Sequence, residues 1–332
     1  MAWRKLYLSA ITLLAGCASV VATPTTSPTL HRVSEVRYVM GTLLDITLYA
    51  PSEAEGRAIL NDTFQVAENL DSVLSTWKPE SPVSVFNRDT NTVVRPVDPH
   101  LYRIVTASLD LSQRTAGAFN VTVRPLVQMW ERSAKSGKAP TAPEIANTRR
   151  LVASDALIVS HPSSLGKKLP GVMIETGGIG KGYAVDEMVT LLRSRGVANA
   201  FINFGRSSIA ALGAPPGASG WELEIALSET STDGTVELRD ETLSVSRAKG
   251  TPFVVNGIAY AHIFDPRTAL PVTTSRGAAL RGPSATDGEA FVKYLIVRGA
   301  PTSNVERAWG DVAWIVKEQD SVRTSTGFAF TH

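Results

Sequence analysis

The chain has 332 residues, of which 43% are hydrophobic and 19% are charged, so it holds enough apolar material for one large domain or two small ones. It contains 33 basic and 31 acidic residues, and the excess of two comes from Arg4 and Lys5, in a stretch that has no acid. The remaining chain is balanced in charge, which argues against a nucleic-acid-binding protein and against electrostatic attachment to a membrane.

Residues 1–17 have the pattern of a bacterial lipoprotein signal. Arg4 and Lys5 precede an apolar run of about ten residues that ends in Leu-Ala-Gly-Cys at Cys17. A transmembrane anchor is disfavoured because the run is too short to span a bilayer. Cys17 is the only cysteine, so it has no partner for an intramolecular disulfide or a thiolate metal site. We therefore predict that Cys17 is lipidated and tethers a periplasmic protein to a membrane, the outer rather than the inner one because Ala18 follows.

The next segments are expected to be a flexible spacer over residues 18–32 and one folded domain over residues 33–332. The spacer is small, Thr-rich and Pro-rich. A period-two strand pair is predicted around Val33–Tyr49, interrupted by Met40-Gly41-Thr42. Ser52 and Glu55 have capping-box spacing and predict a helix that runs to about Leu74.

A second helix is predicted to begin at Asp98-Pro99, a cap followed by a first-turn proline, and to end at Gly117. Residues 131–143 are polar and contain Gly137, Pro140 and Pro143, and we expect them to form a surface loop.

The stretch Gly171–Gly196 is the most informative of the chain. An apolar run of strand type at 172–174 leads into Gly177, Gly178, Gly180 and Gly182, and a helical pattern follows. Glycines allow close backbone approach and a helix start attracts anions, so the loop is a candidate anion site to which Lys181 adds a charge. A tight turn without a ligand is the alternative. The spacing matches neither a P-loop nor the dinucleotide fingerprint.

Beyond Gly196 the pattern favours strands, and a last helix is predicted over about Glu289–Val297, ending at Gly299. Helices and strands are partly segregated along the chain, which indicates an α+β fold. The predicted strands cover residues 200–204, 209–212, 221–227, 235–238, 243–247 and 253–264.

Several short stretches hold more glycine and polar residues than packing requires. In chain order and with the glycine loop among them, they resemble the ApbE family of bacterial flavin transferases, the FAD:protein FMN transferases. The resemblance runs from about Val36 to Gly299. The stretches are Met40-Gly41-Thr42, Ser75-Thr76-Trp77, Gly117–Val123, Asn203-Phe204-Gly205 and His262–Thr268.

The resemblance implies a single ApbE-like, T-fold-related domain with mixed or antiparallel sheets flanked by helices and with the flavin in a central groove. It implies an exported, Mg²⁺-dependent enzyme that cleaves FAD, releases AMP and attaches FMN through a phosphoester to a Ser or Thr of a partner flavoprotein. Two alternatives remain open, an FAD pyrophosphatase that yields FMN and AMP, and a flavin-binding lipoprotein of the same fold without transfer activity. Phosphoryl transfer needs mainly positioning and charge neutralisation, which suits the lysine and the glycine loop.

The resemblance also implies roles for individual residues. His262 and Glu289 would be catalytic, although His262 also has the alternative of a structural histidine. The Gly178 carbonyl and Glu289, or Asp287 in its stead, would bind magnesium. The cofactor-binding residues would be Met40, Trp77, Ala118, Phe119, Asn120, Glu175, Lys181 and Ile263.

Three departures from the family pattern bear on this assignment. Asn120 and Ser207 each stand where the family usually has Asp, and the late Asp and Thr metal motif, aligned on Gly299, becomes Glu289 and Lys293. Glu289 is still able to coordinate Mg²⁺. The alternatives are that the Lys293 ammonium fills the cation site, or that it points away.

Overall fold

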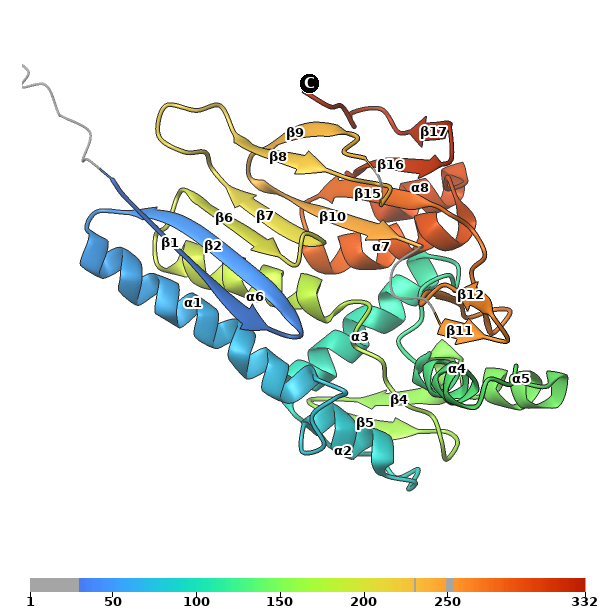
Figure 1. Cartoon of the computed structure of the whole chain (residues 1–332). Coiled ribbons are helices and arrows are strands. Elements are labelled where there is room, and N and C mark those ends of the chain that lie inside the picture. The colour runs from blue at the N-terminus through green and yellow to red at the C-terminus, as the bar shows by residue number, and fades with distance from the viewer. Residues whose placement is uncertain (1–29, 230, 249–252, 332) are drawn as a thin grey trace, which may run out of the picture.

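The computed structural model describes residues 30–229, 231–248 and 253–331, and an eight-stranded antiparallel sheet forms their centre (Figure 1). The strand order is β1-β2-β6-β7-β10-β15-β16-β17. This arrangement of helices and strands confirms the predicted α+β fold. The strands of this sheet are β1 His31–Val39, β2 Thr42–Ala50, β6 Ala200–Phe204, β7 Ser208–Leu212, β10 Glu241–Arg247, β15 Gly277–Gly282, β16 Ala313–Glu318 and β17 Ser321–Thr324.

The predicted strand pair at the start of the domain is confirmed as the β1–β2 hairpin. Val39 pairs with Thr42, which leaves Met40 and Gly41 as a two-residue turn. Both have positive φ, 47° and 77°, the condition for the type I′ turn whose twist matches that of the strands. The Met40-Gly41 pair therefore has a sufficient structural role in the hairpin.

Three long helices cover one face of the sheet: α1 Glu53–Leu74, α6 Gly180–Ser194 and α7 Ala285–Arg298 (Figure 1). The Ser52 half of the predicted capping box of α1 is confirmed, since the Ser52 hydroxyl accepts a hydrogen bond from the Glu55 amide at 3.2 Å. The apolar stripe predicted for α6 is buried against the sheet at Val185, Met188 and Leu192. These helices carry the larger hydrophobic core.

The opposite face of the sheet is covered by the β8–β9 hairpin, Trp221–Ile225 with Gly234–Leu238, and by Phe328 near the C-terminus. Every residue of β7 is buried as a result, because Ile209 faces this hairpin and Ala210 faces the helices. A strand covered on both faces reads as a continuous apolar run, which is what residues 209–212 are.

A second group of short elements packs beside the main sheet around Leu126, Trp130, Val255 and Phe264. It shows where prediction from sequence was incomplete, since several of its elements were not foreseen. The elements not foreseen are α2 Pro82–Arg88, α4 Arg124–Ser136, α5 Ala142–Arg149, η1 Ser154–Ala156, α8 Ser303–Trp309, β3 Arg95–Pro96, β4 Leu157–Ser160, β5 Ser164–Lys167 and β14 Leu270–Pro271. The helix α3 Pro99–Arg114 was predicted, and β11 Phe253–Val255, β12 Ile258–Tyr260 and β13 Phe264–Asp265 lie in one predicted strand.

Two predicted elements in this part of the chain are wrong. Residues 131–136 are not a loop but continue α4, because Met129, Trp130 and Ser133 form a buried stripe along that helix. Residues 172–174 form no strand, since the Asn87 side chain replaces a ladder partner. Its amide donates to the Ile174 carbonyl at 2.8 Å and accepts from the Ile174 amide at 2.7 Å.

Other predictions differ from the structure in their bounds. The predicted strand 253–264 is divided into β11, β12 and β13, and α7 begins at Ala285, four residues before Glu289. The helix expected to run to Gly117 is α3, which ends at Arg114.

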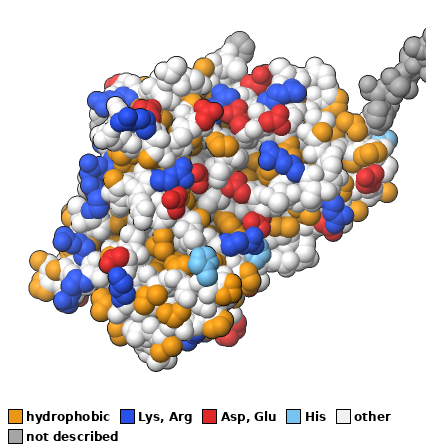
Figure 2. All heavy atoms as spheres, turned by 180° about the vertical axis from the view of Figure 1, so that it is seen from behind, with side chains coloured by type: hydrophobic (Ala, Val, Ile, Leu, Met, Phe, Trp, Pro, Cys, Tyr) orange, Lys and Arg blue, Asp and Glu red, His pale blue; other side chains and the backbone are white. Residues whose placement is uncertain are grey.

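The lipoprotein signal with Cys17 lies outside the described residues, as does the spacer up to residue 29. Within the described residues, no helix is both long enough and apolar enough to cross a bilayer. Figure 2 shows one face of the molecule, on which basic and acidic side chains are interspersed.

Candidate functional site

A cleft of about 1200 Å³ opens between the end of the main sheet and the second group of short elements, which includes α4. Its volume is above the usual range for a small-molecule site. Its walls come from α4, the glycine loop, the turn after β6, the β8 hairpin and the segment before β13. Residues from distant parts of the sequence therefore meet at one place. The predicted site residues that line it are Trp77, Ala118, Phe119, Asn120, Glu175, Gly178, Lys181, His262, Ile263 and Glu289.

Met40 is not among the lining residues. It lies in the β1–β2 turn and packs, partly buried, against the main core. The turn adjoins the cleft through Gly205, whose amide donates to the Leu43 carbonyl at 2.9 Å and which does line the cleft. Met40 thus borders the site without entering its wall.

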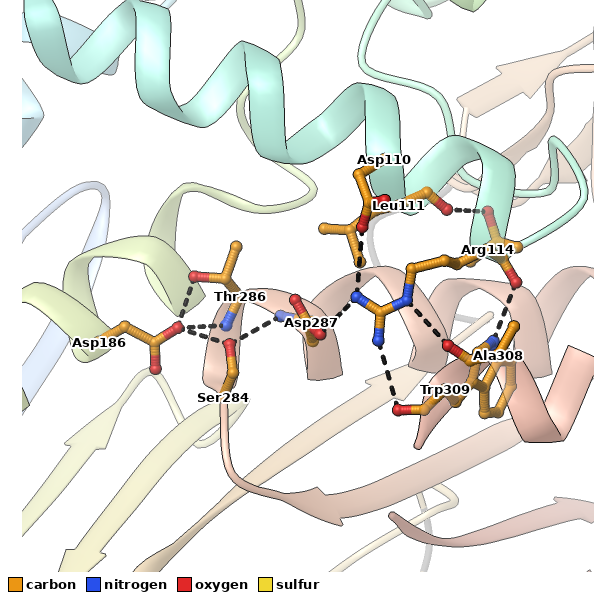
Figure 3. Close-up of polar contacts among 10 residues, drawn as sticks. Asp110, Leu111, Arg114, Asp186, Ser284, Thr286, Asp287, Ala308 and Trp309 are labelled. Carbon is orange, nitrogen blue, oxygen red and sulfur yellow. Dashed lines mark hydrogen bonds and ion pairs between the residues drawn. The ribbon is translucent and has the colours of Figure 1, made fainter. Parts of the chain in front are cut away.

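Asp287, the alternative metal ligand, does not line the cleft either. Figure 3 shows it on the flank of α7 that faces α3, where Arg114 Nη1 lies 2.8 Å from its Oδ2. Arg114 also donates to the carbonyls of Ala308 and Trp309, so it joins three elements. We correct the assignment: the structure gives Asp287 a structural ion pair, because its position in the helix turns it away from the cleft.

The floor of the cleft depends on a contact between α6 and α7 that the sequence did not reveal. The Asp186 carboxylate on α6 accepts hydrogen bonds from Ser284 Oγ at 2.8 Å, from the amides of Ala285 at 2.8 Å and Thr286 at 2.9 Å, and from Thr286 Oγ1 at 2.6 Å (Figure 3). A carboxylate at a helix N-terminus satisfies free amides and interacts favourably with the helix dipole. Asp186 therefore fixes the start of α7 against α6.

Gly182 shows how close this approach is. A Cβ atom at Gly182 would lie 2.3 Å from the Ala285 carbonyl oxygen and 2.9 Å from Glu289 Cγ. No side chain fits at such distances, so only glycine allows α6 to pass here. The close packing brings Lys181 on α6 next to Glu289 on α7.

Glu289 is 1% exposed and is the centre of the charged floor. Lys293 Nζ donates to its Oε2 at 2.6 Å, Lys181 Nζ lies 3.8 Å from its Oε1, and the Ser208 hydroxyl donates a short hydrogen bond to the same Oε1. Burial raises the pKa of this carboxyl, but the two ammonium groups and the donated hydrogen bonds outweigh burial, and the net pKa is lowered. Glu289 is therefore ionised at neutral pH.

His262 is exposed to the cleft beside this floor. The surrounding protein partly desolvates the imidazole, which lowers its pKa below the ordinary 6.5, and the charges of Lys293 and Lys181 lower the pKa further. The ring is therefore neutral at pH 7 and able to accept a proton.

The outer wall combines an aromatic surface with a second set of charges. The Trp77 side chain is 80% exposed, and the Arg124 guanidinium carbon lies 5.8 Å from the centre of its ring. Arg124 Nη1 is also 3.1 Å from Glu175 Oε2 and 3.6 Å from Glu131 Oε1. Nothing in the sequence distinguishes Arg124 except its position directly before the first-turn proline of α4.

Two of the predicted cofactor-binding residues use side-chain oxygens to accept hydrogen bonds from residues two positions further along the chain. Asn120 Oδ1 accepts from the Thr122 amide at 3.0 Å and the Thr122 hydroxyl at 2.8 Å. Glu175 Oε1 accepts from the Gly177 amide at 2.9 Å, which holds the start of the glycine loop. Both residues shape the wall of the cleft, whatever else they contact.

The glycine loop leads into α6 without a side-chain cap. The amides of Ile179 and Gly180 both turn back to the Thr176 carbonyl, at 3.0 and 2.7 Å. Gly177, Gly178 and Lys181 line the cleft, so the start of α6 faces it. Helix starts can bind anionic groups, and the anion site predicted from the sequence stays a prediction.

Comparison with known proteins gives one consistent result. Residues 40–308 match the ApbE family. The chain is 27% identical over 333 residues to the FAD:protein FMN transferase of Klebsiella pneumoniae, covering 97% of this chain and 94% of the relative. It is 26% identical over 271 residues to the enzyme of the same name from Vibrio cholerae, covering 80% of this chain and 78% of that relative.

Solved structures agree in fold. The flavin transferase ApbE from Vibrio cholerae superposes with a TM-score of 0.74 at 22% identity and covers 90% of this chain and 97% of its own. The ApbE protein from Thermotoga maritima superposes with a TM-score of 0.80 at 21% identity and covers 89% of this chain and 97% of its own. The α+β architecture described above is shared with both.

Proposed function

Because this chain belongs to the ApbE family, we propose that it is an FAD:protein FMN transferase, as its curated relatives are named. One observation carries the proposal, which is the content of the cleft. An exposed indole is available to a flavin ring, two ammonium groups to a diphosphate, and a neutral imidazole to an acceptor hydroxyl.

The proposed reaction is a phosphoryl transfer from FAD to a Ser or Thr hydroxyl of a partner flavoprotein. The hydroxyl oxygen attacks the phosphorus on the FMN side, and the bond from that phosphorus to the bridging oxygen breaks. The bridging oxygen leaves with AMP, and FMN remains joined to the partner through a phosphoester. The hydroxyl proton is taken up by the enzyme.

His262 is the proposed acceptor of that proton. A general base must be unprotonated at the working pH, and the lowered pKa of His262 supports this role. A positioned base contributes about 10²- to 10⁴-fold to such reactions.

Lys181 and the start of α6 are proposed to bind the diphosphate. The Lys181 ammonium and the glycine loop border the same part of the cleft, and charge neutralisation with positioning is most of what phosphoryl transfer requires. Trp77 and Phe119 are proposed to contact the flavin, since both line the cleft and aromatic stacking adds to burial.

The magnesium ion that the family resemblance implies would rest on Glu289 and the Gly178 carbonyl. Magnesium requires free oxygen ligands in near-octahedral geometry. Both oxygens of Glu289 already interact with an ammonium, and one also accepts from Ser208. This donor set does not fit a divalent cation, and no step of the proposed reaction is assigned to one.

The proposal is tested by incubating the purified chain with FAD and a flavin-accepting protein that contains a Ser or Thr site. We expect covalent FMN on the acceptor, detected by in-gel fluorescence, together with release of AMP. His262→Gln should slow transfer by about 10²- to 10⁴-fold and retain FAD binding. FAD converted to FMN and AMP without an acceptor would instead identify the pyrophosphatase, and binding without cleavage would identify a flavin-binding lipoprotein.

A further part of the proposal concerns location. The lipoprotein signal pattern supports export and a lipid anchor at Cys17, with the outer membrane favoured over the inner one. Cys17→Ala should release the protein into the soluble periplasmic fraction or leave an unprocessed precursor. Detection of a wild-type protein that is soluble and carries no acyl group would contradict the anchor.

A further inference from the structure

The floor of the cleft contains more positive than negative charge. Lys181 and Lys293 contribute two ammonium groups, and Glu289 contributes the carboxylate between them. Lys293 follows Glu289 by one helical turn, which puts both side chains on the same flank of α7. The group therefore carries one net positive charge.

The ammonium groups have hydrogen-bond donors to spare. A lysine ammonium has three donors. Lys293 uses one on Glu289, and among the described residues Lys181 has its charged partner at 3.8 Å, beyond hydrogen-bond distance. Both side chains line the cleft. Their remaining donors are available to oxygens of a bound anion.

The carboxylate holds these groups in a fixed arrangement. Glu289 is buried, and Ser208 on β7 holds the same oxygen that faces Lys181. A carboxylate in this setting anchors the ammonium groups, as it would anchor a metal ion. A divalent cation at Glu289 would have to displace Lys293 or lie beside two like charges, which repel it.

We propose that the ammonium groups of Lys181 and Lys293 neutralise the diphosphate of FAD in place of a divalent metal ion, so that this chain binds and cleaves FAD without magnesium. The inference rests on the proposed function, since it concerns the same substrate in the same cleft. During cleavage the ammonium donors stabilise the charge that develops on the bridging oxygen as it leaves with AMP. The lysines supply hydrogen bonds only and form no covalent bond to the phosphate.

The first test needs no variant. FAD is titrated against the purified chain by quenching of tryptophan fluorescence, once in EDTA and once with excess MgCl₂, and FAD cleavage is followed under the same conditions. We expect the two dissociation constants to agree within about twofold, since no ion is gained on binding. Binding or cleavage that occurs only with Mg²⁺ overturns the inference and leaves the proposed function intact. Absence of FAD binding under both conditions overturns the proposed function and the inference with it.

The second test uses Lys293→Thr, which removes the ammonium and offers an oxygen. We expect FAD affinity in EDTA to fall at least about tenfold, the effect of one charge-assisted hydrogen bond, and to recover when Mg²⁺ is added. Lys181→Met, at a side chain that is partly exposed in the cleft, should weaken binding in EDTA to a similar degree.

The matched control is Lys168→Thr. Lys168 pairs with Asp155 at 3.1 Å on an exposed surface and does not line the cleft, so this variant should bind FAD as the wild type does. Melting curves of the variants show whether each is folded. Unchanged FAD affinity in EDTA for both Lys293→Thr and Lys181→Met refutes the inference.

Discussion

The two flanks of α7 carry the same kind of residue with opposite consequences. Asp287 and Glu289 are two positions apart, which is about 200° around a helix. Asp287 faces α3 and pairs with Arg114 (Figure 3). Glu289 lines the cleft and pairs with Lys293. Helical phase, and not residue type, decides which acid belongs to the site.

The outer flank is a structural junction. Arg114 lies with its guanidinium carbon 4.7 Å from the ring centre of Phe291, and that ring stacks on Trp309 with centroids 4.7 Å apart. The charge and the hydrogen-bond donors of Arg114 are paired with groups of the protein itself. On the cleft flank, Lys181 and Lys293 keep ammonium donors that no oxygen of the described residues uses. Unused donors beside a cleft, more than charge itself, therefore distinguish the flank that belongs to the proposed site.

The largest effect is expected when the carboxylate of each flank is neutralised in turn. Glu289→Gln should lower the free energy of unfolding by about 3 kcal/mol, because it removes the buried counter-charge of two neighbouring, only partly exposed ammonium groups. Asp287→Asn should cost less than about 1 kcal/mol, since that pair is partly exposed. Urea denaturation of both variants measures the difference. Equal losses for the two would erase the distinction between the flanks.

Gly182→Ala attacks the close approach that brings the cleft flank together. The added methyl group meets the Ala285 carbonyl, and separating α6 from α7 should cost about 2 kcal/mol in stability and weaken FAD binding. Gly180→Ala is the control, because its Cβ would meet only Thr176 at 3.9 Å. Denaturation and FAD titration of both variants provide the measurement. A Gly182→Ala protein as stable as Gly180→Ala would contradict the argument.

Asp186→Asn weakens the contact at the start of α7 without touching either flank. The amide retains an oxygen acceptor and loses the charge that favours the helix N-terminus, so we expect a cost of about 1 kcal/mol. The unfolding midpoint in urea should shift by the corresponding amount. FAD affinity should change less than it does in Gly182→Ala. If it falls further, Asp186 contributes to binding and not only to the fold.

The smallest effect concerns pH. The lowered pKa of His262 keeps its imidazole neutral to below pH 6.5, so the acid limb of FMN transfer should lie below that value. Lys293→Thr removes a cation that disfavours protonation, so the pKa of His262 rises and the acid limb moves to higher pH. The pH profile of kcat/KM, measured in EDTA so that no Mg²⁺ replaces the lost charge, tests this. Asp287→Asn should leave the limb unmoved.

Sequence periodicity predicted the elements that pack on one face in a regular pattern. The hairpin with Met40-Gly41, the cap at Ser52 and the stripe of α6 all follow from local spacing, and the structure has them. The interruptions were harder to foresee. Residues 131–136 look polar, but they continue α4 because the buried stripe of that helix begins before them.

The site was predictable as a set of segments but not as a set of contacts. Most predicted residues line the cleft, because short motifs identify positions that meet. The role of Asp186 depends on its contact with α7, which lies about a hundred residues later in the chain. Asp287 was a candidate metal ligand because the sequence alone does not show which side of α7 faces the cleft. Tertiary packing, and not local pattern, determines both.

The contact between Asp186 and α7 also bears on the order in which the molecule folds. It joins residues that are 98 to 100 positions apart, whereas the β1–β2 hairpin closes through a two-residue turn. Long loops close more slowly and at a higher entropic cost than short ones, so we expect the hairpin to form early and α7 to dock late. Lys181 and Glu289 meet only at that late stage. A chain that has folded only up to β10 therefore lacks the Glu289 and Lys293 part of the proposed diphosphate site, and we expect FAD to stabilise only the molecule in which α7 has docked.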